Sequence, residues 1–403
     1  MAMQDDPTAR TLRTRADDRP GRDSGDDANG FRDALPGDGR RAVRPGEPRL
    51  EGVVPAAGLA DGTAGPVPGG RQHSPRTGVA DGDVVGSPGG REPVPGPRLD
   101  RPVAAGGYAW WYLDATSDDG REAVTLIAFV GSVFSPYYVA ARRRGTADPM
   151  DHVAINVALY RQRGGVWCMT ERGRAAATRT PQSYAIGPSS LKWDGSTVRF
   201  DVDEVAVPWP RRLRGSVTAT VPAMLEHPVA LDGAGRHRWR PLAPLARVEV
   251  DFSHPRMRWS GHAYIDSNDG DEPLEHAFNG WHWSRMRLDD RRAAVHYDVE
   301  GLDGTRRAYA FRFEDGTTRM VPPQRERELP RTRWGLLRRT RGDGPVALLR
   351  SLEDTPFYAR ALLDAEVDGM RTVAVHESLS LSRFGRNWVQ WMLPFRMPRR
   401  SGR

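Results

Sequence analysis

The sequence is poor in cysteine and in long apolar runs. Cys168 is the only cysteine among 403 residues, which excludes an intramolecular disulfide and a thiolate metal cage within one chain. A chain without disulfides fits a cytoplasmic compartment best. The longest apolar run, Val124–Phe134, is shorter than the ~20 residues that a spanning helix needs, and the first residues lack the apolar core of a secretory signal. We therefore predict a cytoplasmic protein without a membrane-spanning segment.

Lysine is nearly absent as well, because Lys192 is the only one and arginine supplies the remaining positive charge. The formal net charge of +7 predicts a basic surface, which favours anionic partners such as nucleic acid or an acidic lipid headgroup layer. No recognisable nucleic-acid-binding module accompanies the arginines. We therefore predict no nucleic-acid partner.

The signature motifs of common enzyme classes are missing too: there is no GxGxxG, P-loop, HExxH or GxSxG pattern. The stretch Asp266–Gly270 resembles the start of a calcium-binding EF-hand loop. Its glycine comes one position early, and Ala277 stands where that loop needs a glutamate. A metal site could also be built from four of the histidines, although separate strand and loop positions explain them more simply: His254, His262, His276 and His282. We predict no metal site.

The composition changes abruptly near Ala105. Residues 1–102 contain no tryptophan or tyrosine and are crowded with glycine, proline, aspartate and arginine. Such a segment cannot bury enough apolar surface to offset the entropy lost on ordering it. We therefore predict a disordered leader over residues 1–104.

From Gly106 onward, short runs rich in β-forming residues alternate with turn signals. Runs such as HVAINVALY, RVEVDF and RRAYAFRF are separated by DDG, DG and LDG clusters, which are typical of turns. This regular succession predicts an all-β sandwich or barrel. One segment, Val346–Val367, instead has the composition of a helix, interrupted at Pro356.

The β-rich body is long enough for two domains, which we place at residues 105–257 and 258–398, with the join between Phe252 and Gly261. Its two halves echo one another: AWWYLDATSDDGREAVTLIAF and GWHWSRMRLDDRRAAVHYDV both run from an aromatic cluster through an acidic turn to a strand. Duplicated β units would produce this echo. The ordinary recurrence of hairpins would produce it equally well.

Polar and aromatic residues gather in and just before the stretch Arg258–Glu272: His237, Trp239, Trp259, His262, Tyr264, Asp266, Asn268, Asp269, Asp271 and Glu272. The alternation of His237 with Trp239, and of His262, Tyr264 and Asp266, points each set to one face of a strand, where they could line one wall of a cavity. A carboxyl group beside aromatics in an apolar pocket can have its pKa raised by up to ~3–5 units, which would make it an acid at neutral pH. A solvated turn would equally explain the acidic residues, and an aromatic core would explain the aromatic ones.

Ten segments of the body resemble carotenoid 1,2-hydratases, the hydroxyneurosporene synthases of photosynthetic bacteria. The segments follow one another in order from Gly106 to Arg400, and they include IGPSSLKWDG, RWSGHAYIDSNDGDEPLE and LEDTPFYAR. The resemblance implies two tandem lipocalin-like β-barrel domains, here preceded by the leader. It also implies a hydro-lyase that adds water across the terminal C1–C2 double bond of acyclic carotenoids such as neurosporene or lycopene, without an organic cofactor. The family's functional His-x-Trp and Tyr-x-Asp pairs fall on His237 and Trp239 and on Tyr264 and Asp266.

These four residues suggest a mechanism in which Asp266, held protonated, protonates C2 and water attacks the tertiary cation at C1. Tyr264 would hydrogen-bond Asp266 or hold the water, and the π face of Trp239 would stabilise the cation. His237 would accept the proton that the water loses. The alternative is a non-catalytic lipocalin-like carrier of hydrophobic ligands. The presence of all four residues argues against this alternative.

A carotenoid is dissolved in membrane lipid, so we also expect peripheral contact with the intracytoplasmic membrane. The C-terminal segment NWVQWMLPFRMPRRSGR combines aromatic and basic residues, which suit an anionic bilayer surface. A final barrel strand with a solvated basic end would explain the same segment.

Overall fold

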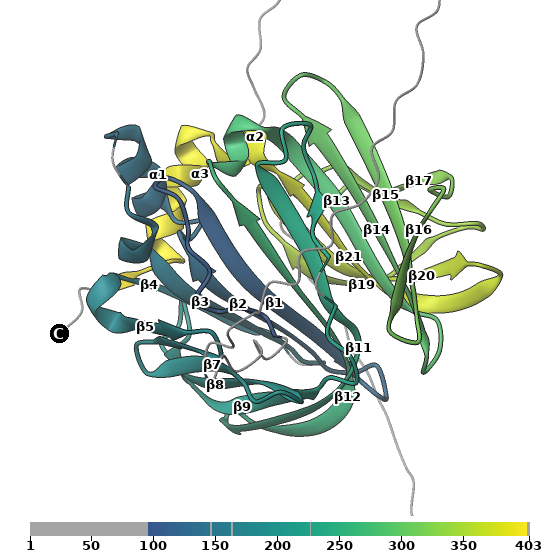
Figure 1. The fold of residues 1–403 in the computed structure, drawn as a ribbon, viewed down its shortest axis with the longest axis horizontal. Helices are drawn as coiled ribbons and strands as arrows, with labels where there is room; N and C mark the ends of the chain where they lie inside the picture. The colour runs from purple at the N-terminus through teal and green to yellow at the C-terminus, as the bar shows by residue number, and fades with distance from the viewer. Residues whose placement is uncertain (1–95, 146, 163, 226, 401–403) are drawn as a thin grey trace, which may run out of the picture. The chain divides into compact units, whose positions relative to one another are not determined.

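The computed structural model describes residues 96–145, 147–162, 164–225 and 227–400, and its strands form two curled sheets and a small two-stranded ribbon (Figure 1). Most of the expected leader, residues 1–95, lies outside the described residues. Its last residues, however, pack on the body: Leu99 is fully buried in a core cluster, and Trp111 Nε1 donates a hydrogen bond to the carbonyl of Pro97 at 2.9 Å. We therefore propose that the folded body begins before residue 104, where we expected the leader to end.

The first sheet has the strand order β22-β4-β3-β2-β1-β12-β11-β9-β8-β7-β6-β5, and β10 pairs with β11 off this path. Its strands are β1 (Tyr108–Ser117), β2 (Ala123–Val130), β3 (Val153–Tyr160), β4 (Val166–Arg172), β5 (Ala177–Thr180), β6 (Ser183–Ile186), β7 (Ser189–Trp193), β8 (Thr197–Val205), β9 (Arg212–Thr220), β10 (Val229–Ala230), β11 (His237–His254), β12 (Arg256–Gly270) and β22 (Arg399–Arg400). Only residues 173–176 join β4 to β5, although the two strands lie near opposite ends of the path. The sheet must therefore bend back on itself.

The second sheet has the order β16-β15-β14-β13-β21-β20-β19, and β17 pairs with β18 in the ribbon. These strands are β13 (Phe278–Arg287), β14 (Arg292–Gly301), β15 (Arg306–Glu314), β16 (Thr317–Val321), β17 (Glu326–Leu329), β18 (Arg338–Arg341), β19 (Ala347–Asp354), β20 (Tyr358–Val367) and β21 (Met370–Ser380). Every pairing in this sheet is antiparallel. The all-β class expected from the strand pattern, with two successive β units, is confirmed.

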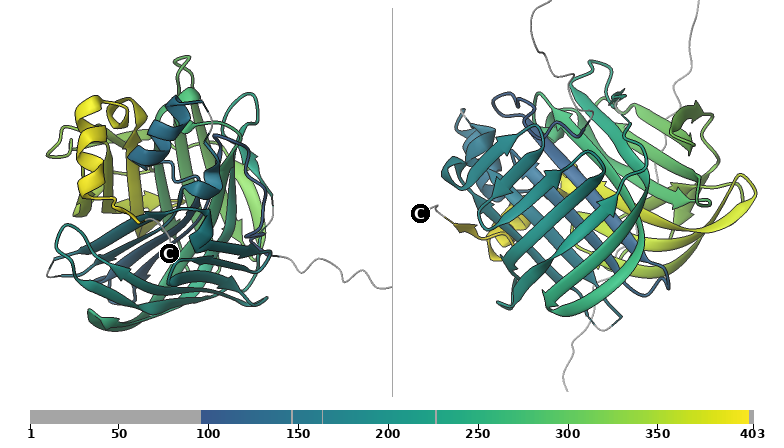
Figure 2. Two further views of the ribbon diagram at one scale, coloured as in Figure 1. Left: turned by 90° about the vertical axis from the view of Figure 1, so that its left-hand side faces the viewer. Right: turned by 60° about the horizontal axis from the view of Figure 1, so that its bottom comes forward.

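Short helices gather on one side of the two sheets (Figure 2, left). They are α1 (Pro136–Arg143), α2 (Leu381–Phe384) and α3 (Asn387–Met392), with the 3-10 turns η1 (Pro149–Asp151), η2 (Arg174–Ala176), η3 (Leu274–His276) and η4 (Leu393–Phe395). Helix α1 begins where it does because Ser135 Oγ accepts hydrogen bonds from the backbone N–H groups of Tyr137 and Tyr138, both at 3.1 Å, and Pro136 occupies its first turn. None of the described helices is long and apolar enough to cross a bilayer.

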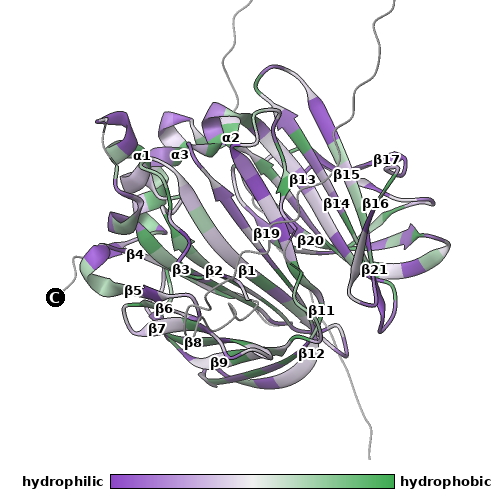
Figure 3. Cartoon of the chain, viewed as in Figure 1, coloured by the Kyte–Doolittle hydropathy of each residue, from purple (hydrophilic) through white to green (hydrophobic). Residues whose placement is uncertain are grey.

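Strand β1 is buried on both faces, because the two sheets pack against each other there. Trp111 and Leu113 point into the core that the curl of the first sheet encloses. Tyr108, Trp110 and Tyr112, at the alternate positions, belong to a second core cluster that includes residues of the second sheet. Figure 3 shows hydrophobic and hydrophilic bands along many of the strands. The interface between the sheets is thus lined by one face of β1 and its neighbours.

Two expectations concern individual strands. The helix expected over Val346–Val367 is wrong: the segment forms the hairpin β19–β20. Pro356 lies in its turn, and packing of alternate residues of β20 into the sheet outweighs the helix propensity of its alanines and leucines. The two echoing segments are hairpins, β1–β2 and β13–β14.

The expected domain join at residues 257/258 falls just after the turn between β11 and β12, which pair with each other along most of their length. The chain leaves the first sheet only after Gly270 and begins the second at Phe278. We therefore propose residues 271–277 as the junction between the two β units.

Candidate active site

Strands β11 and β12 place the four predicted functional residues on the side of the first sheet that faces the second. Tyr264 and Trp239 belong to the core cluster shared by the two sheets, whereas Ile265, between Tyr264 and Asp266, points into the first sheet's own core. The register places Asp266 opposite Tyr112 of β1. As expected for residues two positions apart in a strand, the two members of each pair therefore point to the same face of the sheet.

Asp266 is the centre of this group. Its side chain is almost completely buried, with 5% of the residue exposed. Trp239 Nε1 donates a hydrogen bond to Asp266 Oδ2 at 2.8 Å, and the hydroxyl of Tyr264 donates to the same oxygen at 3.1 Å. Both bonds go to Oδ2, so Oδ1 is the oxygen that can carry a proton without losing either.

Burial raises the pKa of Asp266 to about 8, because desolvation disfavours the charged carboxylate. The bonds from Trp239 and Tyr264 favour the carboxylate and act against this rise, while the negative charges of Glu377 and Asp114 add to it. At neutral pH the protonated form therefore predominates. Such a group can act as a general acid under conditions in which an ordinary aspartate is ionised.

Aromatic rings enclose both donors. Trp239 is fully buried, with the ring of Tyr297 at 5.6 Å and that of Phe311 at 5.2 Å between centroids. Tyr264 lies against Trp283 at 5.2 Å and, edge to face, against Tyr112 at 6.4 Å. These contacts restrict the orientation of both side chains and keep water from Asp266.

His237 is fully buried but has other partners. Its Nδ1 lies 2.9 Å from the hydroxyl of Tyr108, and its Nε2 lies 3.5 Å from Glu272 Oε1. Burial lowers the pKa of His237, which opposes the influence of nearby carboxylates. Tyr108 in turn stacks on Trp110 at 4.9 Å. His237 is therefore connected to the interface between the sheets through Tyr108.

The remaining sequence candidates have other surroundings. Asp269 points away from Asp266 and forms ion pairs with three arginines, Arg101, Arg238 and Arg240. His262 accompanies an exposed ion pair between Arg247 and Asp118, and Asp271 pairs with Arg238. Asn268 is buried, whereas Trp259 is only partly buried, against the first sheet's core.

The four histidines considered as metal ligands do not form a site. His282 Nδ1 bonds to Ser378 Oγ at 2.8 Å, His276 lies in η3, and His254 is exposed at the end of β11. Within the described part of the chain, no group of three or more His, Cys, Asp or Glu side chains is arranged to hold a metal ion.

An apolar cavity of about 320 Å³ lies between the two sheets and helix α3. Its walls are mostly aromatic and aliphatic, and they include Trp110, Phe129, Phe134, Trp167, Trp281, Phe357 and Met392. Tyr112 lines the cavity and contacts Tyr264, which bonds to Asp266. The four predicted residues are not among its lining residues, so they lie behind Tyr112 in this conformation.

The sequence interpretation missed a polar network next to the cavity. Asp114 of β1 accepts hydrogen bonds from Arg285 at 2.7 Å and from Arg360 at 2.8 Å. Arg360 also forms an ion pair with Glu377 of β21, and the hydroxyl of Tyr112 lies within hydrogen-bond distance of both carboxylates. The available signal was the presence of single charged residues within apolar runs, as in FYARALL and VAVHESLSL.

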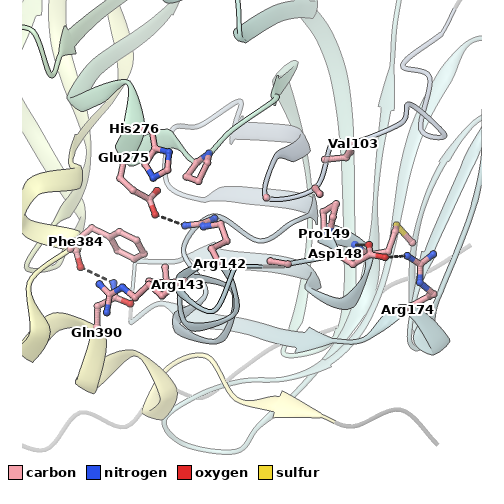
Figure 4. Close-up of a pocket in the computed structure, with 18 of the residues that line it drawn as sticks. Val103, Arg142, Arg143, Asp148, Pro149, Arg174, Glu275, His276, Phe384 and Gln390 are labelled. Atoms are coloured by element: carbon pink, nitrogen blue, oxygen red, sulfur yellow. Dashed lines mark hydrogen bonds and ion pairs between the residues drawn. The ribbon is translucent and has the colours of Figure 1, made fainter.

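A larger cavity, of about 870 Å³, lies elsewhere, beside α1 and η3 (Figure 4). Four of its charged residues form two ion pairs: Arg142 with Glu275 at 2.5 Å, and Arg174 with Asp148. None of the four predicted residues lines it. Size alone therefore does not identify the site, and the smaller apolar cavity is the better candidate because it adjoins the unusual acid.

Comparisons with known proteins show the family of this chain. The family model of the carotenoid hydratase CrtC matches residues 126–403. An acyclic carotenoid 1,2-hydratase of Rubrivivax gelatinosus is 50% identical over 380 residues, which cover 93% of this chain and 94% of that protein. One from Thiocapsa roseopersicina is 47% identical over the same shares of the two chains. The crystal structure of a Nitrosomonas europaea protein assigned as AttH covers 68% of this chain and 92% of its own, with 17% identity and a TM-score of 0.49.

Proposed function

This chain belongs to the carotenoid hydratase CrtC family, and from that premise we propose that it adds water across the terminal C1–C2 double bond of acyclic carotenoids such as lycopene or neurosporene. The reaction would make it a hydro-lyase. The observation that carries the proposal is Asp266: a buried carboxyl group whose pKa is raised to about 8, next to an apolar cavity.

The first step is protonation of the alkene. An isolated trisubstituted double bond is a weak base, so it needs a strong and well-placed acid. Asp266 does not line the cavity in this conformation, so Tyr112, which separates the two, would have to move before Oδ1 of Asp266 delivers its proton to C2. Protonation leaves the more stable, tertiary cation at C1, and water then attacks C1. Positioned proton transfer of this kind is worth ~10²–10⁴-fold in rate.

The aromatic walls of the cavity would stabilise the cation. Trp239 is enclosed by Tyr297 and Phe311, so we assign it to holding Asp266 through its N–H group. Trp110 and Trp281 line the cavity and are better placed for a cation–π contact, worth ~2 kcal/mol when desolvated. His237 would act as a positioning residue, because Tyr108, which it bonds, stacks on Trp110.

A Tyr264→Phe variant tests how Asp266 is tuned. The hydroxyl of Tyr264 bonds to the carboxylate and lowers the pKa of Asp266, so its loss should raise that pKa further and weaken the acid. We expect the alkaline limb of the pH–rate profile to move to higher pH and kcat to fall by roughly fivefold, the equivalent of one hydrogen bond of ~1 kcal/mol. A limb that stays in place or moves to lower pH would contradict this role. Tyr138→Phe, which removes a buried hydroxyl bonded to the Gly107 carbonyl, is the matched control.

A carrier of hydrophobic ligands would use the same cavity, but it would have no need of a buried acid. Incubation of the purified protein with lycopene separates the two functions. The hydratase converts lycopene into a product heavier by one water, whereas a carrier returns lycopene unchanged from the complex.

Exposed aromatic side chains stand next in sequence to the cavity residues Met392 and Arg396. Trp391 is 80% exposed and Phe395 is 74% exposed, and both follow Trp388, which stacks on the cavity residue Trp334 at 6.0 Å. Exposed arginines flank them: Arg386, Arg396 and Arg400. Apolar rings beside cations suit an anionic bilayer surface. We therefore propose that this face rests on the membrane in which the substrate is dissolved.

Loss of the two most exposed rings tests the membrane contact. A Trp391→Ser/Phe395→Ser variant should bind anionic lipid vesicles at least about tenfold more weakly, because each ring contributes of order 1 kcal/mol when it leaves water. Co-sedimentation measures this, with neutral vesicles for comparison. Trp209→Ser removes an equally exposed tryptophan from another part of the surface and should bind as the wild type does. Unchanged binding by the double variant would contradict the contact.

A further inference from the structure

The cavity between the sheets contains a buried carboxyl group that the steps above do not use. Glu377 of β21 lines the cavity, and 13% of its side chain remains exposed. Its Oε1 is held by Arg360 and lies 3.0 Å from the hydroxyl of Tyr112. Unlike Asp266, Glu377 has direct access to the space in which the substrate and the attacking water would meet.

The groups around Glu377 come from both sheets. Arg360 and Asp114 face it, with two tyrosines, Tyr112 and Tyr358, and two further acids, Glu353 and Asp266. Burial raises the pKa of Glu377, and the positive charge of Arg360 opposes this rise. The ion pair favours the carboxylate, which is the form that can take up a proton.

Tyr112 links Glu377 to Asp114 in a way that suits a proton acceptor. Its single hydroxyl proton can serve Asp114 Oδ2 at 2.7 Å or Glu377 Oε1 at 3.0 Å, but only one of them at a time. When Glu377 gains a proton, the Tyr112 hydroxyl can donate to Asp114, and its oxygen can accept the hydrogen of the protonated Glu377. The network therefore tolerates both protonation states of Glu377.

The charges of the network are balanced. Arg285 and Arg360 face the carboxylates of Asp114 and Glu377. A carbocation that forms in the cavity thus meets no excess positive charge. Loss of the Glu377 charge would leave one uncompensated cation beside the site where the substrate becomes positive, and at the low effective dielectric of a buried site this repulsion is substantial.

We propose that Glu377 is the second catalytic carboxyl group, which binds the attacking water and accepts its proton as the C1–O bond forms. A lone pair of the water oxygen fills the empty orbital at C1, and one O–H bond breaks, leaving its electron pair on oxygen and its proton on Glu377. Asp266 has given one proton and Glu377 has taken one, so return of that proton to Asp266 restores the enzyme. The proposal rests on the proposed function, because this step follows protonation by Asp266.

Glu377 is better placed for this step than His237. The Nδ1 atom of His237 is occupied by Tyr108, and the ring does not line the cavity. Glu377 lines it, and its partner Tyr112 lies opposite Asp266 in the strand register. The acid and the base would then act from two different sheets, on either side of the reacting double bond.

A Glu377→Gln variant tests the proposal with lycopene in heavy water. We expect kcat to fall by ~10²–10⁴-fold, whereas the affinity for lycopene, measured by quenching of tryptophan fluorescence, should stay at the wild-type value. Because Asp266 still protonates the alkene, and a cation that meets no water loses a proton again, unreacted lycopene should slowly acquire deuterium. Wild-type kcat in this variant overturns the proposal, and so does loss of both hydration and deuterium exchange.

Glu204→Gln is the matched control. Glu204 is a buried glutamate paired with Arg172 at 2.7 Å in the first sheet, away from the cavity, so this variant should destabilise the fold in a similar way and keep wild-type hydration. If Glu377→Gln does not fold, Glu377→Asp keeps the charge and withdraws the carboxyl group by one methylene; full kcat in that variant overturns the proposal. A wild-type protein that binds lycopene without hydrating it would instead overturn the proposed function itself.

Discussion

Replacement of Asp266 by asparagine is expected to abolish hydration while the fold remains intact. The amide has no acidic proton, so the alkene loses its only proposed proton donor, and the rate should fall by at least ~10²–10⁴-fold. The amide oxygen can still accept the bonds from Trp239 Nε1 and the Tyr264 hydroxyl, which both go to one oxygen of Asp266. The loss should therefore appear in kcat, with little change in affinity for the carotenoid.

Stability provides an internal control for this variant. The folded protein holds the pKa of Asp266 at about 8, well above the ~3.9 of an unfolded chain. The proton bound in the folded state stabilises it fully below pH ~4, and this contribution is lost as the pH rises towards 8. Asparagine has no charge to bury, so the variant should be more stable than the wild type at pH 8, by up to about 5 kcal/mol. Denaturant unfolding at pH 5 and pH 8 measures the difference.

An inactive variant that is less stable than the wild type would show that Asp266 supports the fold. An active, normally folded variant would remove the proton donor from the mechanism. Asp269→Asn serves as a comparison, because Asp269 lies three residues along the same strand but points to arginines on the opposite face. It should keep the wild-type kcat.

The second large effect is expected in the pH dependence of the wild-type enzyme. Only protonated Asp266 can donate, and its pKa is raised to about 8, so kcat should be nearly constant from pH 6 to 7. Above pH 8 it should fall about tenfold for each pH unit, as the protonated fraction does. At pH 10 the rate should be roughly a hundredth of its plateau value. Stopped assays with lycopene in detergent or vesicles, after a check that the protein remains folded at each pH, measure the profile.

The pH at which kcat begins to fall distinguishes a buried acid from an exposed one. An ordinary aspartate, with a pKa near ~3.9, would give a rate that falls steadily from pH 4 upwards. A rate that rises between pH 6 and 9 would contradict proton donation by Asp266. The Tyr264→Phe variant should shift the fall in kcat to higher pH. Such a shift would assign the fall in kcat to Asp266 among the many titratable groups of the protein.

Much of the site could be predicted from the sequence because it depends on local spacing. The alternation of Tyr264 and Asp266 determines which face of β12 they share, and a strand leaves no other arrangement. The same reasoning failed for Val346–Val367, where alanine, leucine and arginine favour a helix locally but the segment pairs as β19 and β20. Strand pairing is decided by distant parts of the chain, which local propensity does not contain.

The network around Glu377 could not be predicted for the same reason. Asp114 and Arg360 bond at 2.8 Å although 246 positions separate them, and local spacing does not reveal that two such distant residues meet. The sequence alone also gave Trp239 and His237 direct roles at the substrate. Neither residue lines the cavity, and because they bond to Asp266 and Tyr108, we propose positioning roles for them instead.

One measurement tests the central claim most directly: incubation of the purified protein with lycopene in heavy water, followed by location of deuterium in the product. If Asp266 exchanges its proton with solvent and delivers it to the alkene, the hydroxylated product must carry the hydroxyl at C1 and one deuterium on carbon at C2. The Asp266→Asn variant must yield no such product. A 1-hydroxy product without deuterium at C2, or equal deuteration by the variant, would contradict hydration by the proton of Asp266.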